Sequence, residues 1–298
     1  MSKLPTTIEG IEAALANFRT DASDEAGRKF KPRPTDVFIA TYPKCGTTWV
    51  QQIVHSLRTQ GDTDYDDISA VVPWIEMCLD LEQDPNAEQK APPRAFKSHF
   101  HGGDVPKGAK YINVVRDPKA VLVSFYKFFE GWYFEPGSVT IDEFAHALLL
   151  GGSRSGRYWD HVVAWWRKRN DADTLLLDYE SMAAAPENAV RRIADFIGFG
   201  DDEDRIQIAI EQSSLAFMSA NGDKYDDKLL RSYRNEPSGL PKDAGSTKVR
   251  SGESSKEARS ISASTLAAFD ETWADTVTAQ IGIANYDALR QAMKALRA

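Results

Sequence analysis

A short apolar run leads through a polar loop into a helical pattern near the N-terminus, and this junction constrains the fold more than any other stretch. The run at 36–41, DVFIAT, is rich in β-branched and aromatic residues, which is typical of a buried strand. The loop that follows carries Lys44 and Gly46, and apolar residues then recur at helical spacing up to Gly61. Backbone N–H groups at the start of a helix attract phosphate, so the junction predicts an anion-binding loop. A plain strand-to-helix turn with threonine caps is the alternative.

Further strand and helix patterns alternate along the chain. The predicted strands after the first are 95–98, 111–115 and 174–178. The predicted helices are 8–18, 117–129, 141–150, 158–169, 187–196, 204–213 and a closing one at 266–281. Because strands alternate with helices, we predict an α/β fold with a central, mostly parallel sheet flanked by helices. We see no internal repeat or linker, so residues 1–298 are predicted to form one domain, with the polar, glycine-rich segment 222–260 as a mobile lid.

Charge and cysteine content restrict the partners of the chain. The net charge of −8 argues against nucleic acid as the main partner, while a small anionic ligand in a local basic site remains compatible. Cys45 and Cys78 are the only cysteines, which favours a reducing compartment. The N-terminus has no signal-peptide pattern, and no apolar run approaches the roughly 20 residues of a membrane span. The sequence therefore predicts a cytoplasmic protein that binds neither nucleic acid nor membrane.

The loop at 42–49 has the sequence YPKCGTTW, which is a poor match to an ATP-binding loop because lysine precedes the glycine. It resembles the 5′-phosphosulfate loop of cytosolic-type sulfotransferases, Y-P-K-S-G-T-T-W, with cysteine in place of serine. That family has a P-loop-like fold and uses 3′-phosphoadenosine 5′-phosphosulfate (PAPS) as donor, releasing the bisphosphate PAP. The resemblance implies that the donor is bound by Lys44, Cys45, Gly46, Thr47, Thr48 and Trp49, with Trp49 on the adenine face.

Three later motifs strengthen this resemblance. The segment VVRDPK at 114–119, followed by VSFY, is similar to the family's 3′-phosphate segment. Two more, DYESM at 178–182 and QSSLAFM at 212–218, resemble the segments that frame the adenine. The resemblance assigns these donor contacts to Arg116, Ser124, Tyr179, Ser213 and Met218.

The C-terminal motifs of the family match less well. Arg250, Ser251 and Gly252 stand where the family has R-K-G, so the 3′-phosphate would lose a lysine unless Lys248 or Lys256 replaces it. The family's dimer motif is matched only by Lys256, Ser260 and Ile261, and Thr265 takes its glutamate position. The oligomeric state therefore stays open.

The segment FKSHF at 96–100 resembles the family's L-K-T-H-L, whose histidine is the catalytic base. The resemblance assigns that role to His99, and an unperturbed imidazole with a pKa of about 6.5 is mostly neutral at cytoplasmic pH. Lys44 would stabilise charge on the bridging oxygen, and Lys97 would orient the sulfonate, so no metal is required. His101 is a rival base. The remaining histidines are interpreted as structural: His55, His146 and His161.

The acceptor is a small molecule whose identity the sequence leaves open. Phe128 aligns with a pocket phenylalanine of the family. An apolar cavity around it is predicted from Trp74, Phe100, Trp132, Tyr133 and Phe134. Such a wall suits phenols, steroids or lipid-like alcohols, and amines remain open.

The leading hypothesis is in-line transfer of a sulfuryl group from PAPS to a hydroxyl or amine. One alternative is a phosphotransferase that uses ATP and Mg²⁺. The other is a catalytically idle nucleotide-binding homologue, which the altered segment 250–252 favours and which the intact Lys44, Lys97 and His99 oppose.

Overall fold

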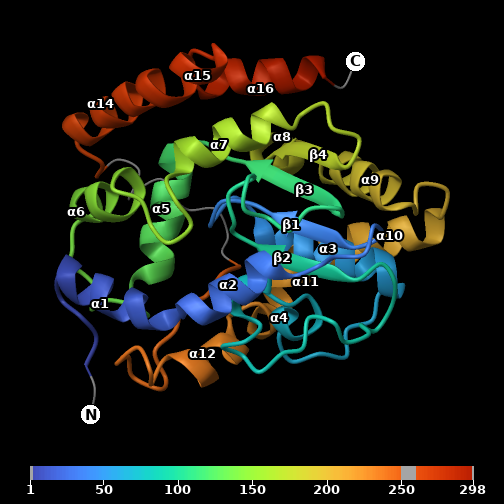
Figure 1. Cartoon of the computed structure of the whole chain (residues 1–298), viewed down its shortest axis with the longest axis horizontal. Coiled ribbons are helices and arrows are strands. Elements are labelled where there is room, and N and C mark those ends of the chain that lie inside the picture. The colour runs from blue at the N-terminus through green and yellow to red at the C-terminus, as the bar shows by residue number, and fades with distance from the viewer. Residues whose placement is uncertain (1–2, 250–259, 297–298) are drawn as a thin grey trace.

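Four short parallel strands form the sheet at the centre of the fold (Figure 1). The computed structural model describes residues 3–249 and 260–296. The strands are β1 (Val37–Ala40), β2 (Ala95–Ser98), β3 (Lys110–Val115) and β4 (Thr174–Asp178), in the order β2-β1-β3-β4. All three strand pairs are parallel. The predicted α/β class with a parallel sheet is confirmed, and each predicted strand lies within a residue or two of its place.

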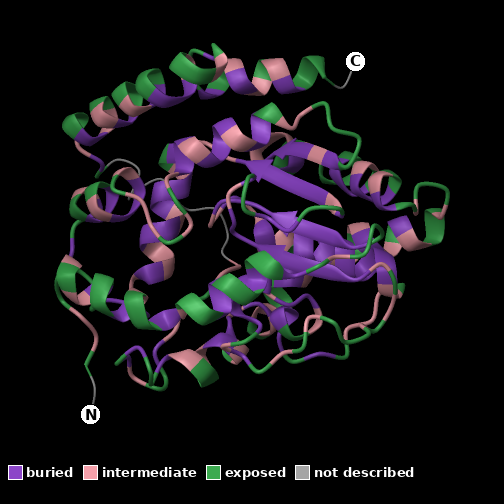
Figure 2. Ribbon diagram, viewed as in Figure 1, coloured by how far each residue is buried: buried purple, intermediate pink, exposed green. Residues whose placement is uncertain are grey.

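Both faces of the sheet are buried, as Figure 2 shows for the strands at its centre. Side chains alternate between the faces of a strand, so consecutive residues of β1 enter different apolar clusters. Val37 and Ile39 pack in the cluster that includes residues of α3 (Thr47–Thr59), α9 (Pro186–Ile197) and α10 (Glu203–Gln212). Phe38 and Ala40 pack in the cluster on the other face. A strand buried on both sides must be apolar throughout, which is why the run at 37–40 could be recognised.

Helices cover both faces and extend to both ends of the chain. On one side lie α7 (Tyr158–Arg167) and α8 (Tyr179–Ala184), with the row α14 (Ala263–Thr272), η4 (Trp273–Thr278), α15 (Ala279–Ile281) and α16 (Tyr286–Ala295) beyond them in Figure 1. The N-terminal α1 (Ile8–Phe18) and α2 (Asp21–Lys29) lie on the opposite side of the view. The remaining helices are α4 (Ile68–Val71), η1 (Ile75–Met77), α5 (Pro118–Phe129), α6 (Ile141–Phe144), η2 (Ala145–Leu150), α11 (Leu215–Ala220), η3 (Gly222–Lys224) and α12 (Lys228–Arg234).

Several of these helices were not predicted from the sequence. Helix α2 reads DASDEAGRK and has no apolar periodicity; it is held by the Thr20 N-cap and by contacts with η1. The chain also does not close with the helix at 266–281, because α16 follows it and packs against β4. Within the predicted lid, residues 222–249 form η3, α12 and a loop, and Tyr225, Leu230 and Leu240 of this segment are buried. Motion of this segment and the single-domain organisation stay predictions.

The strand order places a crevice beside β1. From β1 the chain moves outward to β2, whereas from β3 it moves the other way to β4. In an open parallel sheet, ligands bind outside the carboxyl ends of strands where the connections diverge in this way. The fold therefore directs attention to the segments just after Ala40 and just after Val115. Among the described residues, no helix is both long enough and apolar enough to cross a membrane.

Candidate active site

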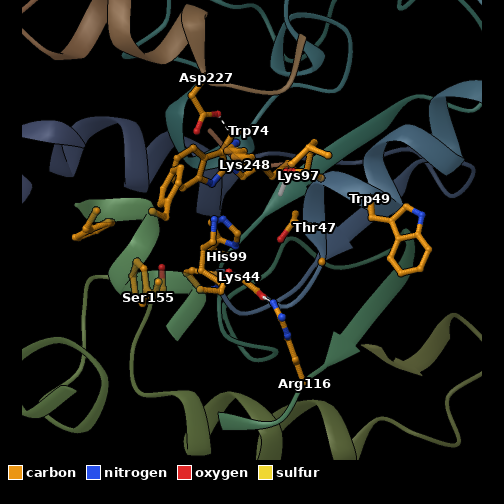
Figure 3. Close-up of a pocket in the computed structure, with 18 of the residues that line it drawn as sticks. Lys44, Thr47, Trp49, Trp74, Lys97, His99, Arg116, Ser155, Asp227 and Lys248 are labelled. Carbon is orange, nitrogen blue, oxygen red and sulfur yellow. Dashed lines mark hydrogen bonds and ion pairs between the residues drawn. The ribbon is translucent and has the colours of Figure 1, made fainter. Parts of the chain in front are cut away.

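The loop after β1 lines a cavity of about 1160 Å³ (Figure 3). Lys44 has a φ of 68° and Gly46 a φ of 98°, so the loop curls back before α3 begins at Thr47. A Cβ on Gly46 would lie 3.0 Å from a ring carbon of Tyr179, which explains the need for glycine there. The first turn of a helix leaves backbone N–H groups without intrahelical partners, and Gly46, Thr47 and Thr48 line the cavity. The loop is thus built to receive an anion.

Cys45 lies beneath this loop. Its thiol is fully buried and does not line the cavity, so its side chain is not placed to contact a ligand. Burial raises the pKa of the thiol to about 12, which keeps it protonated and unreactive. Any contribution of Cys45 to donor binding must therefore come through the backbone.

Arg116 follows β3, and its side chain contacts the loop that follows β1. Its Nη1 donates a hydrogen bond to the carbonyl of Lys44 at 2.9 Å, and its guanidinium carbon lies 4.1 Å from the ring centroid of Tyr179. The buried Nε has no hydrogen-bond partner among the described residues. A planar guanidinium with an unfilled buried donor suits a phosphate group. Ser124, on α5, also lines the cavity.

Trp49 and its neighbours form the end of the cavity next to Arg116. The indole Nε1 donates to the carbonyl of Ser213 at 2.9 Å, which fixes the ring, and the ring meets Tyr179 edge to face at 5.8 Å. Ser213 and Met218 line the same cavity. The structure thus brings together the predicted donor-binding residues of four separate segments.

His99 is held from two sides just after β2. Its Nδ1 lies 2.8 Å from the carbonyl of Thr41, and since a carbonyl only accepts, Nδ1 carries the proton. This assignment leaves the lone pair on Nε2. The backbone N–H of His99 donates to a carboxylate oxygen of Glu76 at 2.5 Å, and the ring packs edge to face on Trp74 at 5.1 Å. Burial, assisted by the charge of Lys97, holds the pKa of His99 well below its usual value, so the ring is neutral near pH 7.

Two predicted lysines also line the cavity. The Nζ of Lys44 lies 3.7 Å from the ring centroid of Phe128, and the Nζ of Lys97 lies 3.9 Å from that of Trp74. Neither ammonium group has a hydrogen-bond acceptor among the described residues. Burial and the charge of Lys248 lower the pKa of Lys97 to about 8 and that of Lys44 well below its usual value. An anion bound between them would relieve both effects.

Aromatic side chains form another part of the cavity lining, the aromatic wall. Phe128 and Trp132 meet edge to face at 5.1 Å, and the indole of Trp132 is fixed by a 2.9 Å bond to Asn235. Trp74 and Tyr133 also line the cavity, as predicted. Lining residues that sequence reasoning missed include Leu15, Phe18, Phe125, Phe129, Leu148, Ser155 and Leu230.

Two of the predicted wall residues point elsewhere. Phe100 is buried in the core beneath Arg28, whose guanidinium carbon lies 4.5 Å from its ring centroid. Phe134 is fully buried against Tyr126 and Phe144. Neither ring lines the cavity, because both are taken up by packing that the sequence does not reveal.

The other histidines lie outside the cavity lining. His101, the rival base, has its Nε2 3.0 Å from the carbonyl of Asp160. Burial lowers the pKa of His55 to about 4 and that of His161 to about 3, which fits neutral packed side chains. His146 lies 3.4 Å from the hydroxyl of Thr265.

Several predictions fall on residues that the structure does not describe. Arg250, Ser251, Gly252 and Lys256 lie outside the described residues, so their donor contacts stay predictions. Of the poorly matched dimer motif, Ile261 and Thr265 are buried. Within 3–249 and 260–296, no three His, Cys, Asp or Glu side chains are grouped to hold a metal ion.

The comparisons with known proteins agree with one another. A family model described as the sulfotransferase domain matches residues 34–280. Dog sulfotransferase 1B1 is 32% identical over 235 residues, which is 75% of this chain and 77% of that protein. Human sulfotransferase 2A1 is 29% identical over 224 residues, covering 72% and 77%.

Solved structures share the fold. Mouse sulfotransferase SULT7A1 complexed with PAP aligns with a TM-score of 0.65 and 21% identity over 94% of this chain and 93% of that one. A retinol dehydratase in complex with androsterone and PAP aligns with a TM-score of 0.64 and 22% identity, covering 83% and 81%. At such identities the likeness concerns the fold alone.

Proposed function

The chain belongs to the sulfotransferase family, and from this membership we propose that it transfers the sulfuryl group of PAPS to a hydroxyl of a small apolar acceptor, with His99 as general base. Sulfuryl transfer is the reaction of the family. The donor, the base and the acceptor class are the parts that we propose.

The residues of the cavity fit such a donor. The loop at Lys44–Thr48 offers backbone N–H groups and an ammonium group to the phosphosulfate, while Arg116 offers its unfilled guanidinium Nε to the 3′-phosphate. Trp49 and Tyr179 give aromatic faces for the adenine. The distant relative SULT7A1 was crystallised with PAP, the desulfonated nucleotide.

The transfer would use groups that are already in place. The acceptor oxygen bonds to sulfur while the bond from sulfur to the bridging phosphate oxygen breaks, and that oxygen keeps the electron pair. The Nε2 of His99 takes the acceptor's proton, since Nδ1 is occupied by the carbonyl of Thr41. Lys44 and Lys97 oppose the charge that develops on the leaving oxygen and on the sulfonate.

The aromatic wall supports an apolar acceptor. Phe128, Trp132 and Tyr133 are suited to a phenol, a steroid or a lipid-like alcohol. The retinol dehydratase of similar fold holds androsterone in its crystal structure. An amine acceptor, the oligomeric state and a cytoplasmic location stay open to experiment.

One observation carries the proposal: a buried neutral imidazole, with its tautomer fixed by Thr41, shares one cavity with two ammonium groups and a helix N-terminus. A phosphotransferase that uses ATP is set aside because the matched family transfers sulfuryl groups.

The test is incubation with ³⁵S-labelled PAPS and a panel of phenols, steroid alcohols and amines. Labelled product is expected with at least one hydroxyl acceptor, and EDTA should not reduce it. Tight PAP binding without product from any acceptor would instead identify an idle homologue. Transfer from ATP that EDTA abolishes would overturn the proposal altogether.

A further inference from the structure

Lys248 carries an ammonium group that the sequence had associated with the 3′-phosphate. Its Nζ lies 2.5 Å from a carboxylate oxygen of Asp227, and the two side chains are 9% and 2% exposed. Its backbone N–H also donates to the carboxylate of Asp226 at 2.9 Å. The ammonium group is therefore fixed in position, and an ammonium has three N–H donors, of which Asp227 occupies one.

The position of this group is at the opposite end of the cavity from Arg116. In Figure 3, Lys248 lies with Trp74 and Lys97, and Lys44 stands between them and Arg116. The ring centroid of Phe128 lies 3.7 Å from the Nζ of Lys44 and 5.7 Å from that of Lys248. Lys248 is thus placed away from the proposed 3′-phosphate site and beside the two lysines that flank His99.

The electrostatics agree with this placement. After burial, the charge of Lys248 is the largest influence that lowers the pKa of both Lys44 and Lys97. Asp227 is the carboxylate that most strongly opposes this lowering of the pKa of Lys44 and of Lys97, and it already bonds Lys248. Three ammonium groups that line one cavity repel each other, so the arrangement favours an anion bound among them. An anion with several equivalent oxygens would give each of them a partner.

We propose that Lys248 is a third catalytic cation, which donates to a non-bridging oxygen of the sulfonate during its transfer, and that Asp227 is the positioning residue that holds it there. The inference rests on the proposed function. The bonds made and broken are those already given: the acceptor oxygen gains sulfur, the bridging phosphate oxygen leaves with its electron pair, and His99 receives the proton. Lys248 transfers no proton in this step.

The experiment compares Lys248→Met with Lys242→Met, a matched change at an exposed lysine of the same segment. Lys248→Met is expected to lower kcat about 100-fold with every acceptor, as the loss of one donor to a developing charge does elsewhere. Its affinity for PAP, which has no sulfonate, is expected to stay close to that of wild type. Lys242→Met is expected to match wild type in both.

Removal of one partner of a buried ion pair can unfold a protein, so the double variant Lys248→Met/Asp227→Asn is included. It should retain the thermal transition and the PAP affinity of wild type while keeping the low kcat. Asp227→Asn alone keeps the ammonium group, and we expect a smaller fall in kcat with no rise in the KM for PAPS. A pure folding defect would not separate kcat from KM in this way.

Three results would overturn the inference. An unchanged kcat in Lys248→Met would show that Lys248 takes no part in the reaction. A loss of PAP affinity as large as the loss of kcat would show that Lys248 binds the 3′-phosphate. A loss confined to anionic acceptors would make it an acceptor-binding group. If the wild-type protein transferred no label, the proposed function would fail. This failure is seen in wild type, whereas failure of the inference about Lys248 is seen only in the variants.

Discussion

The two ends of the cavity are built in different ways. The end that we propose for the donor, the donor end, is made largely by segments that follow β1, β3 and β4, and bonds to the backbone fix its groups, such as that from Arg116 to the carbonyl of Lys44. The acceptor end is made by side chains from α1, α5, the segment at 132–133 and the turn at 153–155, which pack on one another. Strand geometry determines the first end, whereas side-chain volume determines the second. The comparison indicates that one substitution should cost more at the donor end, where single groups are fixed by the backbone, than at the acceptor end, where several side chains share each contact.

The largest effect is expected where the two ends meet. His99→Ala should lower kcat by about 10³-fold, because general base catalysis contributes roughly 10² to 10⁴. Its affinity for PAP should change little, since in the proposed mechanism His99 contacts the reacting atoms and not the nucleotide's phosphates. Single-turnover kinetics and calorimetric titration with PAP measure the two quantities.

The matched control is His101→Ala, because His101 lies outside the cavity lining and its ring bonds the carbonyl of Asp160. We expect it to keep ordinary turnover. If instead His101→Ala were inactive and His99→Ala active, the base would have to be reassigned.

A smaller effect is expected at the donor end alone. Arg116→Ala should weaken PAP binding about 10- to 100-fold, in line with a charged hydrogen bond worth about 1.5–3 kcal/mol. The KM for the acceptor should not move. Arg116→Lys should recover only part of the loss because it lacks the planar fork.

Isothermal titration with adenosine 5′-monophosphate sharpens this test. If Arg116 binds the 3′-phosphate, the variant and wild type should bind that nucleotide equally. An undiminished loss with this ligand would contradict the assignment and make the two ends less distinct than we infer.

The lowered pKa of Lys97 predicts that catalytic efficiency depends on pH. This pKa is lowered to about 8, so the ammonium form, which we propose attracts the sulfonate, is present below pH 8 and is lost above it. The kcat/KM for PAPS should therefore fall about tenfold per pH unit above that value. Because the pKa of His99 is held well below 6.5, no acid limb is expected near pH 6.5.

Lys97→Met should be slower at every pH and should lack the alkaline limb. A limb that persisted near pH 8 in this variant would assign the titration to another group. The pH dependence of kcat/KM is also measured with the acceptor as the varied substrate. A limb seen only with PAPS varied indicates an effect on the donor.

The smallest effect is expected at the acceptor wall. Phe128→Leu keeps most of the side-chain volume but removes the aromatic face, so the KM for a phenolic acceptor should rise about 3- to 10-fold. Phe196→Leu, a half-buried phenylalanine away from the cavity, is the control. A larger loss of PAP affinity than of acceptor affinity would place Phe128 in the donor end, through its contact with Lys44.

The same division explains what the sequence could predict. The strand at 37–40, the loop that follows it and Arg116 are recognisable because each motif is contiguous and its side chains are placed by a strand end. Phe100 was assigned to the acceptor wall and is instead buried under Arg28. Nothing local in the sequence separates a wall phenylalanine from a core one, since both are apolar and lie beside the same strands.

Long-range contacts were the other gap. Glu76, which accepts the backbone N–H of His99, comes from a short 3₁₀ helix 23 residues earlier in the chain. The sequence indicates Lys248 as one of two replacements for the missing lysine of the 3′-phosphate motif, but its partner Asp227 and its neighbours Lys44 and Lys97 are distant in sequence. Pairings of this kind depend on how loops pack, which a single sequence does not encode in any local pattern.

The bond from the His99 ring to the carbonyl of Thr41 has a consequence for how this enzyme can diversify. Thr41 lies three residues before Lys44, so the imidazole is bonded to the same stretch of backbone that we propose binds the donor. In the proposed mechanism, a few peptide units would therefore fix the distance between the proton acceptor and the sulfur. Substitutions in the aromatic wall would then change the acceptor without changing that distance.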